Sequence, residues 1–155
     1  MTDCWSHMLL KTIAFLAVIL SALALIPYGA HLFSLPNKIG MTREQYFVAQ
    51  SIYRGWALLS FILIPAMLVN VVLAVMLWGR AGFGFAVAGC ICMAATLAVF
   101  FAFTYPVNVV TQNWTVAQPD WEMLRRNWEY SHAANAVLAF AAFCLIVLAS
   151  LAPRR

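Results

Sequence analysis

The chain has 155 residues, of which 65% are hydrophobic and 9% are charged. A soluble domain usually has about 25% charged residues, so this sequence lacks the polar surface that a fold in water needs. A lipid environment explains the depletion, because lipid-facing side chains are apolar and helices satisfy their own backbone. The net charge of +4 comes from few residues without a basic run, and we therefore expect no nucleic-acid partner.

Four apolar segments are each long enough to cross a bilayer, which takes about 20 helical residues. We place the spans at about residues 9–33, 55–78, 83–105 and 133–152. The prediction is an all-α fold, a single integral membrane domain over residues 1–155 that forms an up-down-up-down four-helix transmembrane bundle. The first span resembles a signal peptide, with Lys11 before the apolar run, but its length favours an uncleaved span.

Glycine and proline predict where the spans are connected. The sequence Gly-Arg-Ala-Gly at residues 79–82 predicts a tight turn between the second and third spans. Pro36, Pro106 and Pro119 mark the other connections, because proline disrupts a continuing helix.

The second and fourth helices are expected to extend beyond the membrane. Thr42 and Gln45 fit a capping box, and from Thr42 the pattern predicts a helix without a break through Trp78, kinked at Pro65. Asp120 can cap the last helix, since a carboxylate at that position accepts from free backbone N–H groups. Both helices would therefore begin outside the hydrocarbon and run into it.

Orientation rests on the basic residues, which divide almost equally between the two ends of the bundle. One end has Lys11, Arg80, Arg154 and Arg155, and the other has Lys38, Arg43, Arg54, Arg125 and Arg126. Several charges of the second group have acidic partners at helical spacing, and discounting them places both termini in the cytoplasm, in a plasma (inner) membrane. The cytoplasmic half then contains the cysteines, which are not expected to form disulfides there: Cys4, Cys90, Cys92 and Cys144.

Polar residues gather at one membrane level, near the predicted non-cytoplasmic surface. They are Tyr28, His31, Gln50, Tyr53, Arg54, Thr104, Asn108, Arg125, Glu129, His132 and Asn135. Charged groups near hydrocarbon are costly unless they are paired or turned toward the bundle interior. This layer is therefore the candidate functional region.

The fourth helix has the strongest pattern within this layer. Arg125, Glu129 and His132 follow the spacing i, i+4, i+7, which predicts one face of a helix. The interpretation as a site has this face toward the bundle interior. The alternative is an ion-pair stripe that anchors the helix at the interface, with Trp128 in the aromatic belt.

The second helix has a related stripe of Tyr46 and Gln50, continued by Tyr53 or Arg54. Arg54 is suited either to bind an anionic or carbonyl group of a ligand or to pair with Glu129 across the bundle. The glycine that follows it, Gly55, would allow close helix approach.

Metal binding is a further alternative. Glu129 and His132 match one Glu-x-x-His element of carboxylate-bridged metal sites, but the second element of such a site is missing. His31, Glu129 and His132 would suit a mononuclear iron, and His31 with His132 would suit a haem. Both need these side chains to be close in space, and on balance no cofactor is predicted.

Several segments together resemble a known family. They are residues 31–38 (His-Leu-Phe-Ser-Leu-Pro-Asn-Lys), 53–56 (Tyr-Arg-Gly-Trp), 106–108 (Pro-Val-Asn) and the Trp, Arg, Glu and His positions of 121–132. This pattern resembles small four-helix membrane proteins, mostly bacterial and mostly uncharacterised, that are related to the fungal anthrone oxygenases. The resemblance implies oxidation of polycyclic anthrones without an identified organic cofactor, although fold does not imply function.

Two hypotheses follow. In the first, the protein binds or oxidises a small lipophilic molecule, aromatic or quinone-like, at the polar layer. His132 or His31 would act as base, Glu129 would orient it, and Arg54 or Arg125 would stabilise an oxyanion. The substrate-binding residues would be Tyr53, Asn108, Trp114 and Trp128. In the second hypothesis the protein is a non-enzymatic accessory or structural subunit of a homo-oligomer or larger membrane complex, in contact with membrane lipid.

Overall fold

The computed structural model describes the backbone of residues 2–153 and the side chains from residue 5 onwards, except that of residue 6. This part of the chain is helical and contains no strand, as predicted. The predictions for the Cys4 side chain and for Arg154 and Arg155 lie outside the described residues. Cys90, Cys92 and Cys144 are free thiols.

The helices follow one another along the chain, and the longest connection joins α5 to α6. They are α1 (Thr2–Lys38), α2 (Arg43–Gln50), the 3₁₀ helices η1 (Ser51–Tyr53) and η2 (Trp56–Leu59), α3 (Ser60–Met76), α4 (Phe83–Val99), the π-helix η3 (Phe100–Thr104), α5 (Tyr105–Val110) and α6 (Trp121–Leu151). Within residues 2–153, four helical runs are long and apolar enough to cross a membrane: His7–Lys38, Trp56–Met76, Phe83–Val110 and Trp121–Leu151.

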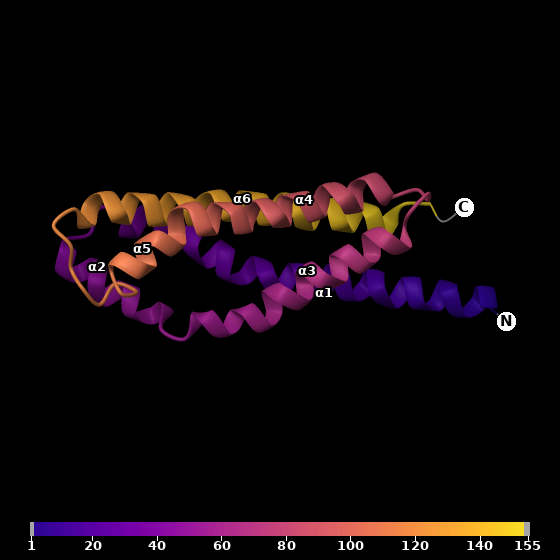
Figure 1. Cartoon of the computed structure of the whole chain (residues 1–155), viewed down its shortest axis with the longest axis horizontal. Helices are drawn as coiled ribbons and strands as arrows, with labels where there is room; N and C mark the ends of the chain where they lie inside the picture. The colour runs from indigo at the N-terminus through magenta and orange to yellow at the C-terminus, as the bar shows by residue number, and fades with distance from the viewer. Residues whose placement is uncertain (1, 154–155) are drawn as a thin grey trace.

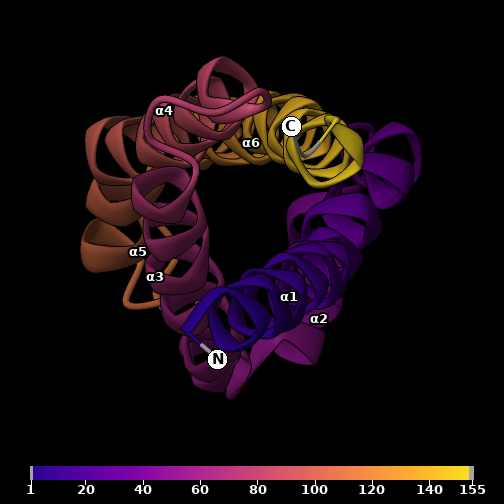
Figure 2. The same cartoon turned by 90° about the vertical axis from the view of Figure 1, so that its right-hand side faces the viewer.

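The long helices pack side by side around a common axis. Both termini lie at one end of this axis, and α2 and α5 lie near the other (Figure 1). α6 contacts α1 and α4, and α3 also contacts α1 and α4, so the four helices succeed one another around the bundle (Figure 2).

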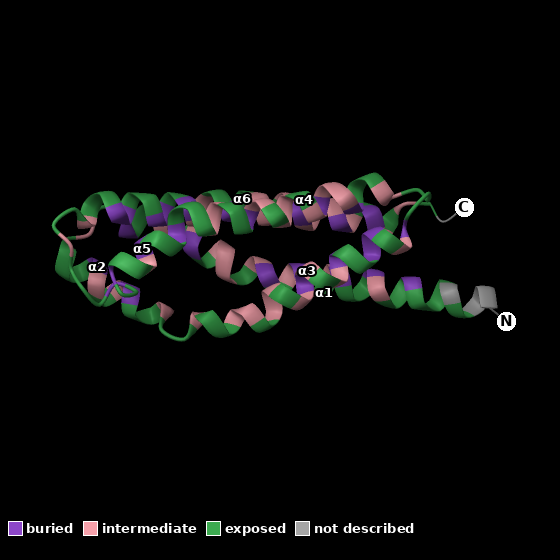
Figure 3. Ribbon diagram, viewed as in Figure 1, coloured by how far each residue is buried: buried purple, intermediate pink, exposed green. Residues whose placement is uncertain are grey.

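Exposed residues occur along the whole length of the bundle, interspersed with buried ones (Figure 3), and many of the exposed residues are large and apolar. Phe33, Phe61 and Trp78 are 81%, 77% and 76% exposed, and aliphatic side chains fill the surface between such rings. A water-soluble protein does not present so continuous an apolar exterior. The exterior therefore suits lipid and agrees with an integral membrane protein.

The first helix is longer than the sequence predicted. α1 continues past Phe33 to Lys38 and contains both Pro27 and Pro36. The expectation that Pro36 marks a connection is therefore wrong. The helix ends at Lys38, and Ile39 and Gly40 form a turn in which the Ile39 N–H donates to the Leu35 carbonyl. This extension matters, because it carries Lys38 to the bundle interior.

The second helix, in contrast, is broken where an unbroken helix was expected. The capping box is confirmed: the Thr42 hydroxyl accepts from the Gln45 backbone, and the Gln45 side chain accepts from the Thr42 N–H. Helix α2 then ends at Gln50, and the continuous helix through Trp78 is wrong. Gly55 has φ of 86°, a left-handed conformation that stops a helix, and no atom lies within 4 Å of a Cβ placed there. Its role is the bend, not close helix approach.

The third helix passes through Pro106, which was also expected to mark a connection. The helical run reaches Val110, and the π-helix η3 immediately precedes this proline in α5. A proline has no N–H to donate to the carbonyl four residues earlier, so the preceding turn widens. Pro119, by contrast, does lie in a connection, between α5 and α6.

The predicted turn at residues 79–82 is confirmed, with Gly79 and Gly82 at φ of 69° and 92°. Beyond it, α4 packs closely on α6, because a Cβ on Gly89 would lie 2.9 Å from Cδ1 of Ile146. The core at this end is made of small and aliphatic residues: Leu10, Ala14, Ala17, Leu73, Ala74, Leu77, Ala86, Ile146 and Ala149. We call it the apolar core.

Candidate functional site

The predicted face of α6 points into the bundle. Arg125 is 6% exposed, Glu129 is 1% exposed, and both ring nitrogens of His132 are buried. Asn135, one turn further along, is also buried. The interpretation that this stripe faces inward is therefore confirmed. We call the side chains that meet around it the polar cluster: His31, Lys38, Tyr46, Gln50, Tyr53, Arg125, Glu129 and His132.

Glu129 lies at the centre of the polar cluster. Its Oε1 lies 2.9 Å from Lys38 Nζ, accepts from the Tyr46 hydroxyl at 2.9 Å, and accepts from Gln50 Nε2 at 3.4 Å. Oε2 is equally buried but has no hydrogen-bond partner. One carboxylate oxygen thus connects the end of α1, both buried side chains of α2, and α6.

The surroundings of Tyr46 raise the pKa of its hydroxyl. Burial is the main cause that raises the pKa of its hydroxyl, and the negative charge and hydrogen bond of Glu129 raise it further. The raised pKa favours the protonated hydroxyl, which donates to the carboxylate.

Lys38 is the partner of Glu129 that the sequence analysis missed. The expected partners were Arg125, at helical spacing, or Arg54 from the second helix. Lys38 lies seven residues after His31, which places both on one face of a helix, but this signal needs α1 to continue through Pro36. The ion pair is almost completely buried, with side-chain exposures of 4% and 0%.

His31 and His132 lie in direct contact, a question that the sequence left open. Their rings stack with centroids 3.9 Å apart and an interplanar angle of 15°. His31 Nδ1 and both nitrogens of His132 are buried and have no hydrogen-bond partner. A neutral imidazole offers one donor and one acceptor, so this histidine pair has hydrogen-bonding capacity that the protein does not use.

Aromatic rings surround the histidine pair. Tyr53 stacks on His31 at 4.4 Å, and Trp56 meets the same ring edge-on at 5.3 Å. The Trp128 ring lies edge-on to His132 at 4.2 Å. These rings come from η1, η2 and α6, so the break in the second helix brings two of them to the histidines.

Tyr53 connects the histidine pair with the ion pair. Of the two residues that were expected to continue the stripe of Tyr46 and Gln50, Tyr53 and Arg54, it is therefore Tyr53 that faces the interior. Lys38 Nζ donates to the Tyr53 hydroxyl at 2.8 Å and lies 4.8 Å from the centre of its ring. Arg54, one residue later, is exposed and makes no ion pair with Glu129. Arg54 therefore lies outside the polar cluster.

Arg125 contacts the connection between α1 and α2 instead of pairing with Glu129. Its Nη1 donates to the carbonyl of Met41 at 2.7 Å, and its guanidinium lies over the Trp121 ring at 4.6 Å. Met41 belongs to the connection between α1 and α2. Arg125 therefore positions this turn and forms no salt bridge with Glu129.

The remaining predicted binding residues lie beside the cluster and contact protein groups. Trp128 Nε1 donates to Asn108 Oδ1 at 2.8 Å. Trp114 is buried, with its ring 4.8 Å from that of Tyr46 and 6.2 Å from that of Trp128.

The loop that carries Trp114 is strained. Gln112, Asn113 and Trp114 have φ of 47°, 55° and 63°, a left-handed conformation that each non-glycine residue adopts at a cost of about 1 kcal/mol or more. Thr111 braces the loop, since its hydroxyl donates to Val107 and accepts from the backbone of Trp114. The loop places the Trp114 ring against Tyr46, and the ring's Nε1 is buried without a hydrogen-bond partner.

The arrangement bears on the metal alternatives. Among the described residues, no group of three or more His, Cys, Asp and Glu side chains is placed to hold a metal ion. His31 and His132 lie face to face, whereas the two axial ligands of one haem lie on opposite sides of the porphyrin plane. In this arrangement the pair does not fit a haem between its rings.

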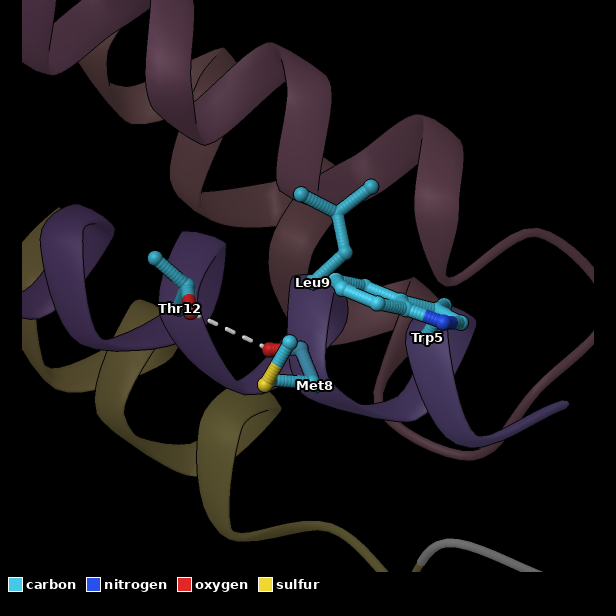
Figure 4. A pocket seen from close by; sticks show the side chains of 4 residues that line it. All are labelled: Trp5, Met8, Leu9 and Thr12. Atoms are coloured by element: carbon cyan, nitrogen blue, oxygen red, sulfur yellow. Dashed lines mark hydrogen bonds between the residues drawn. The ribbon is translucent and has the colours of Figure 1, made fainter. Parts of the chain in front are cut away.

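A surface hollow at the opposite end of the molecule, near the N-terminus, offers little chemistry (Figure 4). It is lined by Trp5, Met8, Leu9 and Thr12, all from the beginning of α1. The Thr12 hydroxyl already donates to the Met8 carbonyl at 3.1 Å. The polar cluster is therefore the candidate site.

Comparisons with known proteins add no relative. No family model matches the chain, and neither the curated proteins nor the solved structures contain a match. The functional argument therefore rests on the geometry of the polar cluster.

Proposed function

We propose that the protein crosses a plasma (inner) membrane four times in alternating directions and binds a small lipophilic, aromatic or quinone-like molecule at the histidine pair. Both termini would be cytoplasmic, which places the polar cluster near the opposite surface. The four long apolar helices and the position of both termini at one end support this topology. Membrane lipid would cover the apolar exterior.

The unpaired nitrogens of the histidine pair carry the proposal. A buried polar group without a partner costs about 1–3 kcal/mol, and His132 alone has two such atoms. Glu129 Oε1 and Asn108 Oδ1 have partners, whereas Glu129 Oε2, Arg125 Nε and Asn135 Oδ1 are buried and also unpaired. The histidine pair differs from these atoms because aromatic rings surround it. A ligand with a hydroxyl or carbonyl group would satisfy the free nitrogens, and the surrounding rings suit a planar aromatic body.

An enzymatic version assigns the proton chemistry to the same atoms. His132, or His31 beside it, would take a proton from an acidic C–H or phenol, leaving the electron pair on an oxyanion. Lys38 rather than Arg54 or Arg125 is placed for this role, because it donates to Tyr53, whose ring stacks on His31. Lys38 would stabilise the oxyanion, and Glu129 would hold Lys38 in place. Oxidation of an anthrone-like anion would further need dioxygen as oxidant.

To test the proposal, the purified protein is titrated with anthrone in mild detergent, and binding is measured by the quenching of tryptophan fluorescence. We expect saturable quenching that His132→Phe weakens at least about tenfold, which corresponds to 1.4 kcal/mol, or the loss of one hydrogen bond. His7→Phe is the matched control, because His7 is exposed near the N-terminus. Equal affinity of His132→Phe and wild type would contradict the proposal.

Turnover and cofactor content are measured on the same preparation. Appearance of anthraquinone would support the enzymatic version, and its absence despite binding would favour a binding protein. An absorption spectrum and metal analysis decide whether an iron or haem is present. A Soret band would require the histidine rings to separate from the stacked arrangement.

A structural role is the second candidate, and the contacts of Glu129 favour it. Three side chains from α1 and α2 meet one oxygen of α6, so the polar cluster also holds the bundle together. In this case the protein would be an accessory subunit or a homo-oligomer. Loss of stability in Glu129→Gln with no effect of His132→Phe on anthrone binding would favour it.

A further inference from the structure

The connection between α5 and α6 reaches the polar cluster through a single buried side chain. This connection lies at the end of the bundle where α2 lies (Figure 1). Of residues 112–118, Trp114 alone is buried, and its ring lies against the rings of Tyr46 and Trp128. The first of these rings bonds to the carboxylate of the buried ion pair, and the second packs on the histidine pair. Trp114 therefore covers the two aromatic side chains that adjoin both parts of the candidate site.

The hydrogen bonds of this segment are all local. Among the described residues, those made by residues 112–118 run only to residues 108–121, and none reaches α1, α2, α3 or α4. Gln118 Nε2, for example, donates to the Val110 carbonyl at 3.0 Å. Because most of the segment is exposed, water can replace such bonds when the segment opens locally. Opening therefore requires the withdrawal of one ring and the loss of no hydrogen bond to another part of the bundle.

The conformation that turns Trp114 inward also has two unfavourable features. Gln112, Asn113 and Trp114 all have positive φ, and strained backbone of this kind is found at functional sites and switch regions. In addition, Trp114 Nε1 is buried without a partner, whereas a buried indole N–H usually has one. If Trp114 turns outward, the backbone can return to an ordinary conformation and the N–H can bond to water. Both features therefore favour opening.

We propose that residues 112–118 form a lid, with Trp114 as the side chain that closes it over the polar cluster. Both ring nitrogens of His132 are buried, so a ligand reaches them only after part of the protein moves. The lid can make this movement without disturbing the long helices, because only the Trp114 ring ties it to the aromatic core. Its role in ligand entry rests on the function proposed above, whereas the opening itself does not.

Oxidation of wild-type protein in nanodiscs by hydroxyl radicals tests the opening, because radicals react with side chains that water reaches. Trp114 and Trp128 form a matched pair, since both are 4% exposed. Trp128 lies on α6, however, and its Nε1 donates to Asn108. We expect Trp114 to be oxidised several-fold faster than Trp128, as measured by mass spectrometry of peptides. Equal rates, or faster oxidation of Trp128, would overturn the proposal.

A variant that strains the closed lid further should increase this difference. Gln112→Val places a β-branched residue at a positive φ, where it fits poorly, and the replaced side chain is exposed. Ala117→Val is the control, because it adds the same side chain at an exposed position of the lid without a positive φ. We expect several-fold faster oxidation of Trp114 in Gln112→Val, with unchanged circular dichroism, and the wild-type rate in Ala117→Val.

Unchanged oxidation of Trp114 in Gln112→Val would contradict the proposal. If this variant also loses helical content, the comparison of Trp114 with Trp128 in the wild type decides the question alone.

Stopped-flow measurement of anthrone binding tests whether the lid controls entry. We expect anthrone to associate several-fold faster with Gln112→Val than with wild type or Ala117→Val, because opening precedes entry. Equal association rates would contradict a role of the lid in entry. Absence of anthrone binding to the wild type would instead contradict the proposed function, and the oxidation rates of Trp114 and Trp128 would still decide whether the lid opens.

Discussion

The two ends of the bundle are held together by different physical means, although α1 and α6 supply residues to both. At one end Lys38 of α1 meets Glu129 of α6 in a buried ion pair. At the other, Ala14 and Ile146 belong to an apolar core of small and aliphatic side chains. The comparison shows how a helix bundle in lipid achieves specificity without the hydrophobic effect between its helices.

The two ends should also differ in how they respond to mutation. In the apolar core, small residues let backbones approach, and each contact contributes a small dispersion energy. In the polar cluster, the ion pair and the hydrogen bonds to Glu129 Oε1 each depend on a particular partner, and a removed partner leaves a buried charge or dipole unsatisfied. Single substitutions should therefore be most damaging in the polar cluster.

The largest effect is expected from Glu129→Ala, which leaves the Lys38 ammonium buried without its counter-charge. Breaking a buried ion pair in this way costs about 3–5 kcal/mol. Reversible unfolding in mixed micelles, followed by circular dichroism, measures the loss. Glu44→Ala is the control, because Glu44 forms the exposed pair with Arg43 and should leave stability unchanged.

A double variant separates the charge from the packing. Lys38→Met combined with Glu129→Leu replaces both charges by apolar groups of similar length, which is often neutral or stabilising for a buried pair. We expect it to recover most of the stability that Glu129→Ala loses. A double variant as unstable as the single one would show that shape, rather than charge pairing, holds this end.

Tyr46→Phe should have the next largest effect, because it removes a donor to a charged acceptor. Hydrogen bonds of this kind contribute about 1.5–3 kcal/mol. Burial raises the pKa of Tyr46 above its ordinary value of 10.0, so the folded protein keeps this proton to higher pH than the unfolded chain. The stability that Tyr46 contributes is complete below pH 10.0 and falls as the pH rises further.

Denaturation measured across this alkaline range checks the sign. Wild type should lose stability above pH 10.0 more steeply than Tyr46→Phe. Tyr130→Phe is the control, since Tyr130 is exposed and its ring lies outside the polar cluster. Parallel curves for wild type and Tyr46→Phe would show that the Tyr46–Glu129 bond does not influence folding.

In the apolar core the corresponding test is Gly89→Ala. A Cβ at this position would lie 2.9 Å from Cδ1 and 3.1 Å from Cγ1 of the buried Ile146. Overpacking of this kind costs about 1–3 kcal/mol. Gly84→Ala is the matched control in the same helix, because no atom lies within 4 Å of its Cβ, and it should be neutral or stabilising. A larger loss for Gly89→Ala than for Glu129→Ala would reverse the comparison between the two ends.

The sequence predicted what depends on local pattern. The four spans follow from composition, the turn at residues 79–82 from its glycines, and the inward face of α6 from the spacing of Arg125, Glu129 and His132. Each of these features depends on residues that are close in the chain, so periodicity alone carries the information.

The features that sequence analysis missed depend on contacts between distant segments. Lys38 reaches Glu129 only because α1 continues through Pro36, and prolines inside a transmembrane helix are tolerated when neighbouring helices support them. Tyr53 rather than Arg54 faces the cluster because Gly55 bends the chain there, which no periodic pattern encodes. The contact between His31 and His132 requires the relative rotation of α1 and α6, a tertiary property.

The smallest expected effect concerns the capping box at Thr42, and it tests how the polar cluster obtains two of its donors. α2 has 8 residues, too few for a stable helix in isolation, yet it presents both Tyr46 and Gln50 to Glu129. Thr42→Ala should cost about 1 kcal/mol, measured by unfolding in mixed micelles, whereas Thr42→Ser keeps the hydroxyl and should match wild type. If both variants were equally unstable, the Thr42 methyl group rather than the cap would support α2. In that case the hydrogen bonds that Tyr46 and Gln50 donate to Glu129 would not depend on the exposed Thr42 hydroxyl. Contacts inside the bundle would then be sufficient to position both donors.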